Sequence, residues 1–261
     1  MPRFKYLLLV ATVISVVADA GSVRLLAAEL ADTATTRLND DPYERLNKKL
    51  FSFNDGLDRY LMKPVAKGYV AVTPSPVGRG ITNFFNNLGE PRVVLNDVLQ
   101  GKLGQAVSDS VRFLLNSTLG IGGLFDVAKH FGLKRHSEDF GQTLAVWGVK
   151  RSSYFVIPVF GPSSVRDTIG ELVDFFTYPL VYYHDVGVSS GLYVLRLVNS
   201  RANLLDASDI LDAAAGDYRY EFVREAYWQN RKNEIYDGNP PLDLPYMIED
   251  EPADGQPEGP P

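Results

Sequence analysis

The stretch Asn83-Phe84-Phe85-Asn86-Asn87-Leu88-Gly89-Glu90-Pro91 decides how the middle of this 261-residue chain folds. Apolar residues from Val77 to Leu88 recur at helical spacing, and Ser75-Pro76 precedes them, so the pattern predicts a helix that begins there. The residue before a proline avoids the helical region, so Glu90-Pro91 predicts a break and the start of a second helix. Gly101 suits the left-handed position that closes a helix.

The same spacing of three and four continues along the chain and predicts a succession of short amphipathic helices. In the first of them, Asp41 is expected to cap, Pro42 to take the first helical position and Glu44 to complete a capping box, while Lys63-Pro64 is expected to end it. Ser137 and Ser164 are expected to cap later helices. The expected ranges are 41–63, 75–89, 90–101, 103–120, 137–147, 164–176, 190–206 and 217–236.

One segment departs from helical spacing. Ser153 to Phe160 is β-branched and aromatic, and it contains Pro158. A proline excludes a central strand, so an extended or re-entrant loop is expected there. The fold class is therefore expected to be all-α.

The two ends of the chain differ in composition from its body. Arg3 and Lys5, a largely apolar run from Leu7 to Val17 and Ala18-Asp19-Ala20 predict a secretory signal peptide over 1–20, with a second possible cleavage site after Ala28. Residues 21–40 are expected to be a linker and 41–237 one helical domain. Residues 238–261 hold six acids, seven prolines and no Lys or Arg, which predicts a disordered acidic tail.

Charge and cysteine content narrow the function classes. Of the net charge of −6, the signal contributes +1 and the tail −6, which leaves residues 21–237 at −1. A nearly neutral body argues against nucleic acid as a partner, since that would require a basic stripe. The chain has no cysteine, so it forms no disulfide and offers no thiol to acylate.

No constellation with the spacing of a known catalytic, metal or cofactor site was found. His130 and His136 are six residues apart, which is not a zinc-ligand spacing, and His184 is isolated. Ser163 and Ser164 precede a helix and are expected to cap it rather than to act as nucleophiles. The interpretation is that the protein is not an enzyme and uses no cofactor or metal.

Two features of the sequence can be interpreted either structurally or functionally. The turn Gly120-Ile121-Gly122-Gly123 is either a tight turn after a helix cap or a hinge or narrow wall of a passage. Arg166 lies on an otherwise apolar helix with Asp167 and Asp174, and is expected to pair with Asp174 or another acid rather than to bind a headgroup.

Amphipathic helices in an exported protein also allow two interpretations. They bury their apolar stripes in one soluble core, or they lie in a membrane interface with those stripes toward lipid. From residue 21 onward there is no stretch of roughly 18 uncharged apolar residues, so no membrane-spanning helix is predicted. Fourteen Phe and fourteen Tyr favour the interface slightly.

The joint order of these motifs resembles that of the MlaA/VacJ family of outer-membrane phospholipid-transport proteins. The matching pieces are Asp41 to Asn47, Phe53-Asn54, Lys63 to Ala66, Asn83-Phe84, Asn87, Glu90-Pro91, Asn96, Leu99 to Gly101, Asn116, Gly120 to Asp126, Glu138 to Leu144, Trp147 to Val149, Pro158, Gly161-Pro162, Ser164 to Asp167, Arg201 to Asp206 and Arg224 to Gln229. Each piece is weak alone, and their order over nearly 200 residues carries the resemblance.

The resemblance implies a ring of helices seated in the inner leaflet of the Gram-negative outer membrane, on its periplasmic side, with a central channel. Family members withdraw mislocalised phospholipids from the outer leaflet and pass them to a periplasmic lipid-carrier protein, which maintains lipid asymmetry, and they associate with a trimeric porin. Typical members are lipoproteins, from which this cysteine-free chain departs. A periplasmic scaffold or binding protein without lipid translocation remains the alternative.

Two sets of residues are expected to matter. The candidate lipid passage consists of Phe51, Phe53, Asn54, Val111, Leu114, Leu115, Gly120, Gly122, Gly123, Tyr154, Phe155 and Pro158, with the segment 154–160 as a possible gate. The structural and family-motif residues are Asn83, Asn87, Glu90, Pro91, Asn96, Gly101, Asp126, Gly161, Arg166, Asp167 and Asp174.

Overall fold

The computed structural model describes residues 41–149 and 151–241. The expected signal peptide, the linker and most of the expected tail lie outside these residues. In chain order the described elements are α3 (Glu44–Leu57), the π-helical η1 (Asp58–Met62), α4 (Lys63–Val72), α5 (Ser75–Leu99), α6 (Leu103–Thr118), η2 (Ala128–Phe131), α7 (Phe140–Val146), β1 (Tyr154–Ile157), β2 (Gly161–Ser164), α8 (Val165–Thr177), η3 (Pro179–Tyr182), α9 (Val186–Asn203), α10 (Leu205–Ala215), η4 (Gly216–Tyr218) and α11 (Arg219–Ile235).

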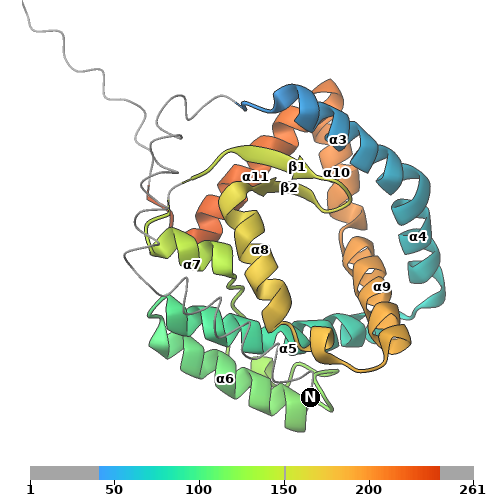
Figure 1. The fold of residues 1–261 in the computed structure, drawn as a ribbon. Helices are drawn as coiled ribbons and strands as arrows, with labels where there is room; N and C mark the ends of the chain where they lie inside the picture. Colours follow the sequence, from blue (N-terminus) through green and yellow to red (C-terminus); the bar gives the residue numbers. More distant parts are fainter. Residues whose placement is uncertain (1–40, 150, 242–261) are drawn as a thin grey trace, which may run out of the picture.

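Together these elements enclose a ring (Figure 1). One side is formed by α3 and α4, with α9 packed along α4, and the next by α5. The helix α6 packs along α5 and lies outside it, while α7, α8, α11 and the hairpin close the ring opposite α4 and α9. The expected all-α class is confirmed, with one two-stranded hairpin as the exception.

The first helix is longer than expected and begins later. It starts at Glu44, and Asp41 accepts hydrogen bonds from the Tyr43 backbone N–H (3.1 Å) and from Asn47 (2.8 Å) instead of acting as the cap. The expected end at Lys63-Pro64 was wrong. The chain remains helical through η1, where the Lys63 N–H donates to the Asp58 carbonyl five residues back. This wider turn brings Pro64 to the start of α4, where its missing N–H is tolerated.

The helix α5 is continuous through Pro91, so the expected break at Glu90-Pro91 was also wrong. A proline inside a helix removes one backbone hydrogen bond, here to the Asn87 carbonyl. Most helical stability in proteins comes from tertiary packing, and α5 packs along α6. Beyond its end Gly101 has φ +77° as expected, and the Lys102 N–H donates to the Asp97 carbonyl (2.8 Å).

The expected loop at 153–160 is instead part of an antiparallel hairpin, in which Tyr154 pairs with Ser164 and Ile157 with Gly161. Pro158 lies in the turn and interrupts no pairing, so the proline argument against a strand did not apply. Two asparagines of α3 bind the outer edge of β1. Asn47 accepts from Val156 N–H (2.9 Å) and donates to Tyr154 O (3.2 Å). Asn54 donates to Ile157 O (2.9 Å) and accepts from Val159 N–H (2.7 Å), so amide side chains replace a third strand.

Later helix ends differ in detail from expectation. The cap of α7 is Asp139, which accepts the Gln142 N–H, and not Ser137. The expected cap at Ser164 is confirmed, because its hydroxyl accepts the Asp167 N–H. The expected helix 190–206 is two helices, α9 and α10, divided at Leu204.

No helix among the described residues is long and apolar enough to cross a membrane. Their apolar cores are three small clusters, centred on Phe85, Phe140 and Tyr154. Among residues 41–149 and 151–241, buried polar and charged side chains outnumber buried apolar ones. In an ordinary soluble domain most buried side chains are apolar, so this excess of buried polar side chains is unusual.

Candidate functional site

The helix α6 has its polarity reversed. The residues that it buries are Ala106, Asp109, Arg112 and Asn116. The stripe on its other face is exposed, at 63% for Leu103, 65% for Val107, 40% for Val111 and 59% for Leu114. A helix of a soluble domain turns such a stripe inward, so this exposed row marks a surface that meets apolar material.

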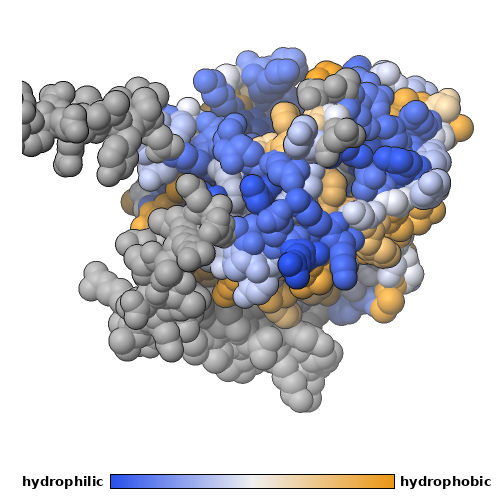
Figure 2. Space-filling view, turned by 90° about the horizontal axis from the view of Figure 1, so that it is seen from above, coloured by the Kyte–Doolittle hydropathy of each residue, from blue (hydrophilic) through white to orange (hydrophobic). Residues whose placement is uncertain are grey.

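The same reversal recurs elsewhere in the ring. In α8, Arg166, Asp167 and Asp174 are buried, while Ile169, Leu172 and Phe175 are exposed. Other exposed apolar side chains belong to α3, η1, α4 and α9: Leu46, Phe53, Tyr60, Val65, Val72, Val194 and Leu197. In Figure 2 hydrophilic residues fill the centre of the visible described surface and hydrophobic residues gather toward its right and lower margins.

The contact between α5 and α6 is lined by carboxyl groups. Asp97 and Asp109 are fully buried, and Asp109 lies 2.8 Å from Nδ1 of His136. Burial, reinforced by the negative charge of Asp109, raises the pKa of Asp97 to about 8. Burial likewise raises the pKa of Glu90 to about 7, against the opposing charge of Arg135.

The turn after α6 is built by motif residues from both helices. Asp126 accepts from Asn116 (3.0 Å) and Arg112 (3.1 Å), which ties the turn to α6. Asn87 of α5 donates to Ser117 (2.9 Å), and a Cβ at Gly123 would lie 2.4 Å from the Asn87 Cβ. Gly123 is therefore required by this close approach as well as by its φ of +91°.

The motif residue Asn83 and the candidate passage residue Gly120 lie at the same turn. Asn83 donates to the Leu124 carbonyl (3.3 Å). A Cβ at Gly120 would lie 2.2 Å from the Phe125 carbonyl oxygen. By contrast, a Cβ at Gly122 would meet nothing within 4 Å, although its φ is +67°.

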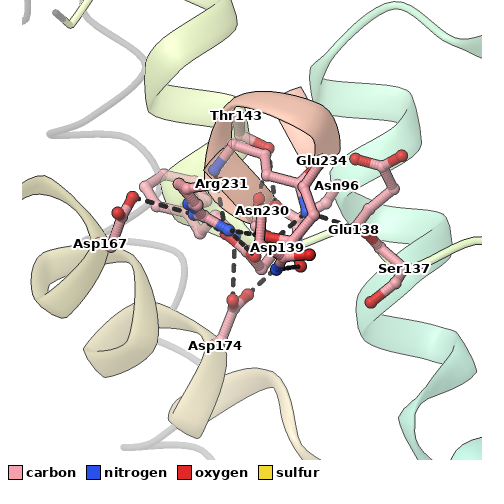
Figure 3. Close-up of polar contacts among 12 residues, drawn as sticks. Asn96, Ser137, Glu138, Asp139, Thr143, Asp167, Asp174, Asn230, Arg231 and Glu234 are labelled. Carbon is pink, nitrogen blue, oxygen red and sulfur yellow. Dashed lines mark hydrogen bonds and ion pairs between the residues drawn. The ribbon is translucent and has the colours of Figure 1, made fainter. Parts of the chain in front are cut away.

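Arg231 of α11 joins three helices in the cluster of Figure 3. Its guanidinium donates to both oxygens of Asp139 (2.6 Å each), to Asp167 (2.9 Å) and to Glu234 (3.0 Å). Although burial acts against it, Arg231 holds the pKa of Asp139 down at about 2. We call Arg231, Asp139 and Asp167 the charge cluster, and it holds α7, α8 and α11 together.

The expected pairing of Arg166 with a nearby acid is confirmed, and of the acids allowed the partner is Asp167 (2.9 Å), not Asp174. Asp174 instead accepts from Asn96 (3.1 Å) and from the Phe140 N–H (2.9 Å). Burial raises the pKa of Asp174 to about 6, and the charge of Arg92, 3.7 Å away, opposes that shift.

The structure divides the candidate passage residues into two groups. Phe51, Asn54, Tyr154 and Pro158 meet where α3 holds the hairpin, and Phe51 packs edge-on against Tyr220 of the same apolar cluster. Nearby, Phe53 is exposed and Phe155 is partly buried. The second group lies on α6 and its following turn, across the ring from the hairpin (Figure 1): Val111, Leu114, Leu115, Gly120, Gly122 and Gly123. Val111 and Leu114 are on the exposed stripe, and Leu115 is half-buried.

Sequence reasoning missed a cavity of about 290 Å³ between α5 and α9. Arg92, Arg135 and Arg196 line it, beside the ring of Tyr178. A signal was available, because Arg196 interrupts the apolar run of α9 in the way that singled out Arg166 on α8. No sequence pattern indicated that arginines from α5, α9 and the loop before α7 meet at one cavity.

A helical ring with buried charged side chains and exposed apolar rows has the polarity expected of a protein at a membrane surface. Comparison with known proteins agrees with this class. The model of the family described as "MlaA lipoprotein" matches residues 39–234, and the chain belongs to that family.

Relatives with curated names share about a third of their residues with this chain. The intermembrane phospholipid transport system lipoprotein MlaA of Escherichia coli is 37% identical over 72% of this chain and 76% of its own length. The protein of the same name from Haemophilus influenzae is 32% identical over 79% of this chain and 84% of its own length. A protein of Rickettsia felis, described as uncharacterized, is 35% identical over 75% of this chain and 78% of its own length.

A solved structure is also similar. It comes from work on the structural basis for maintenance of bacterial outer membrane lipid asymmetry, and it is 36% identical to this chain with a TM-score of 0.66. The match covers 77% of this chain and all of the other.

Proposed function

We propose that this chain is the outer-membrane component of a phospholipid trafficking system. It removes mislocalised phospholipids from the outer leaflet and passes them to a periplasmic carrier, which maintains lipid asymmetry. The names of the relatives motivate this proposal. The structural observation that carries it is the reversed polarity of α6, with Asp109 and Arg112 buried and Leu103, Val107 and Leu114 exposed.

The reversed polarity matches the physical problem of moving a headgroup. A charged headgroup crosses hydrocarbon only at a cost of several kcal/mol, because polar groups there lose their water. We propose that the exposed rows contact acyl chains and that polar groups along the route replace that water. We propose that the exposed rows hold the ring in the leaflet nearest the periplasm. No helix among the described residues is long and apolar enough to span a membrane.

Retention at the membrane is proposed to rest on these rows and on a trimeric porin. The 261 residues contain no cysteine to carry an acyl chain. A single acyl chain would give only marginal binding in any case.

Of the candidate passage residues, we propose that those held at the hairpin line the route and that the segment 154–160 gates it. Val111 and Leu114 are better assigned to the lipid-facing row, since α6 lies outside α5 and both side chains are exposed. Tryptophan in place of Gly122 is expected to block transport if that turn narrows the passage. Normal lipid asymmetry in this variant would remove the turn from the route.

Vesicle flotation tests the membrane surface. The purified chain is expected to float with phospholipid vesicles in detergent-free buffer, and Val107→Asp with Leu114→Asp is expected to abolish flotation while circular dichroism stays helical. The matched control is Asn233→Asp with Asn239→Asp, which adds two negative charges at exposed positions away from α6. A wild-type chain that stays monomeric in buffer and ignores vesicles would contradict the proposal.

Deletion of the gene in its own host tests transport. Surface-exposed phospholipid in the outer leaflet is expected to rise on deletion and to fall when the gene is restored. Membrane binding with no change in surface phospholipid would favour the second candidate, a scaffold or binding protein without lipid translocation.

A further inference from the structure

The cavity between α5 and α9 is unusual in its charge. Its lining combines three arginines, several amide and hydroxyl groups and a few apolar side chains: Thr82, Phe85, Asn86, Gly89, Arg92, Val93, Arg135, Tyr178, Arg196, Asn199, Ser200, Asn203 and Leu204. No carboxylate belongs to this lining in the part of the chain that the structure describes. A cavity with three cations and no acid in its wall favours an anion.

The three guanidinium groups retain free hydrogen-bonding capacity. Arg196 lies over the Tyr178 ring, 4.6 Å from its centroid, and makes no hydrogen bond or ion pair with the residues described. Arg92 is 3.7 Å from Asp174, and its buried Nε has no hydrogen-bond partner among them. Arg135 is 3.6 Å from Glu90, and its side chain is 39% exposed.

Asp174 and Glu90, the acids next to the cavity arginines, do not fully neutralise the positive charge of the cavity. Asp174 already accepts from Asn96 and from the Phe140 N–H, and Glu90 also faces Arg112 (4.0 Å). Burial raises the pKa of Glu90 to about 7, which reduces its negative charge near neutral pH. The cavity therefore keeps a net positive potential.

The shape of the cavity restricts the ligand. A volume of about 290 Å³ lies at the lower end of ligand pockets, about 300–1,000 Å³, so it accepts a phosphate with its glycerol but not two acyl chains. Arginine presents parallel N–H groups that match phosphate oxygens. Phe85, Val93 and Leu204 provide the apolar side on which glycerol carbons can rest.

We propose that this cavity, with Arg92, Arg135 and Arg196, binds the phosphate of a lipid headgroup and gives the protein a preference for anionic over zwitterionic phospholipids. The inference rests on the proposed function, because it names the headgroup that the lipid route selects. A zwitterionic headgroup brings an ammonium or quaternary amine into a wall of three arginines with no acid to receive it.

Titration calorimetry on the full chain in nonionic detergent tests the preference. The probes are dihexanoyl phosphatidylglycerol, dihexanoyl phosphatidylcholine and inorganic phosphate. We expect wild type to bind phosphatidylglycerol about tenfold more tightly than phosphatidylcholine. Arg196→Gln is expected to remove most of that difference.

Matched variants control for charge and folding. Arg79→Gln removes the same charge from an exposed position on α5 and is expected to leave the affinity within about twofold. If Arg196→Gln loses its helical circular dichroism, Arg135→Gln, which removes another cavity arginine, replaces it. Equal affinity of wild type and a folded cavity variant for phosphatidylglycerol would overturn the proposal.

The remaining outcomes separate the sources of the phosphate and the two proposals. Inorganic phosphate that binds as tightly as the lipid would show a small-anion site and overturn headgroup recognition. If gene deletion raises surface phospholipid but the cavity variants bind phosphatidylglycerol like wild type, only this inference fails. If the cavity shows the expected preference but deletion leaves surface phospholipid unchanged, the transport proposal fails and the binding site stands.

Discussion

Arg231 and Arg196 lie on different sides of the ring, and their surroundings differ completely. Arg231 of α11 is paired with Asp139, Asp167 and Glu234. Arg196 of α9 has the Tyr178 ring below it and a cavity beside it. A buried cation surrounded by carboxylates stabilises the packing of helices, whereas a cation left without a carboxylate beside a cavity is available to a ligand.

The largest expected effect is on the charge cluster. Arg231→Met leaves the partly buried Asp139 without its cation and leaves Asp167 with Arg166 alone, and we expect the free energy of unfolding to fall by about 3–5 kcal/mol. Thermal unfolding in detergent micelles measures it. The control is Arg59→Met, whose surface pair with Asp55 is exposed and should matter by less than about 1 kcal/mol. Equal losses in the two variants would show that the cluster is not what holds α7, α8 and α11.

A smaller loss is expected at the glycine turn, where two neighbouring positions form a matched pair. Gly123→Ala places a Cβ 2.4 Å from the Asn87 Cβ at a φ of +91°, and overpacking plus left-handed strain should cost about 2–4 kcal/mol. Gly122→Ala has open space and should cost only about 1 kcal/mol of strain. Similar melting temperatures for both variants would contradict the close approach of α5 to this turn.

A pH dependence follows from the α5–α6 contact. The pKa of Asp97 is about 8 in the folded protein and about 3.9 in an unfolded chain, so the folded state binds the extra proton. Its contribution to stability is complete below about pH 4, falls as pH rises towards 8 and is constant above that. Glu90, with a pKa of about 7, adds a slope of the same sign.

Asp97→Asn isolates this contribution. The variant should lose part of the slope and unfold at a higher temperature than wild type at pH 9, with little difference at pH 4. Chemical unfolding between pH 4 and 9 measures the slope. A wild-type stability that increases over that interval would mean that Asp97 is ionised in the fold.

The smallest effect on stability is expected at Arg196. Arg196→Gln breaks no ion pair among the described residues and loses only a contact with an aromatic ring, so unfolding should change by less than about 1 kcal/mol. The same melting measurement used for Arg231 checks it. A loss as large as that of Arg231→Met would assign Arg196 a structural rather than a ligand-binding role.

The sequence predicted the amphipathic helices better than their orientation. Spacing located the stripe through Val111 and Leu114, but the same spacing describes a buried stripe and an exposed one. The opposite face held the missing information, because Asp109, Arg112 and Asn116 also recur at three and four residues. A helix with a regular apolar row and an equally regular charged row can bury either row. Only the packing of α6 on α5 shows that the charged row is the buried one.

The remaining differences depend on contacts distant in sequence. Asn47 and Asn54 hold the hairpin across about a hundred residues, which no local propensity reveals. The helix α5 continues through Pro91 where it packs along α6, a contact that the local Glu90-Pro91 signal does not reveal. Local signals were sufficient only where the cause is local, as with the cap at Ser164 and the glycine at 101.

The reversed polarity of α6 has a consequence for how the chain folds. In water, hydrophobic collapse gathers Leu103, Val107 and Leu114 and leaves Asp109 and Arg112 outside, which is the opposite of the native arrangement. The native arrangement becomes the favourable one when hydrocarbon takes up the apolar row. Under the proposed membrane location, we therefore expect the α5–α6 pair to assemble on the lipid surface, which would act as a template for its folding.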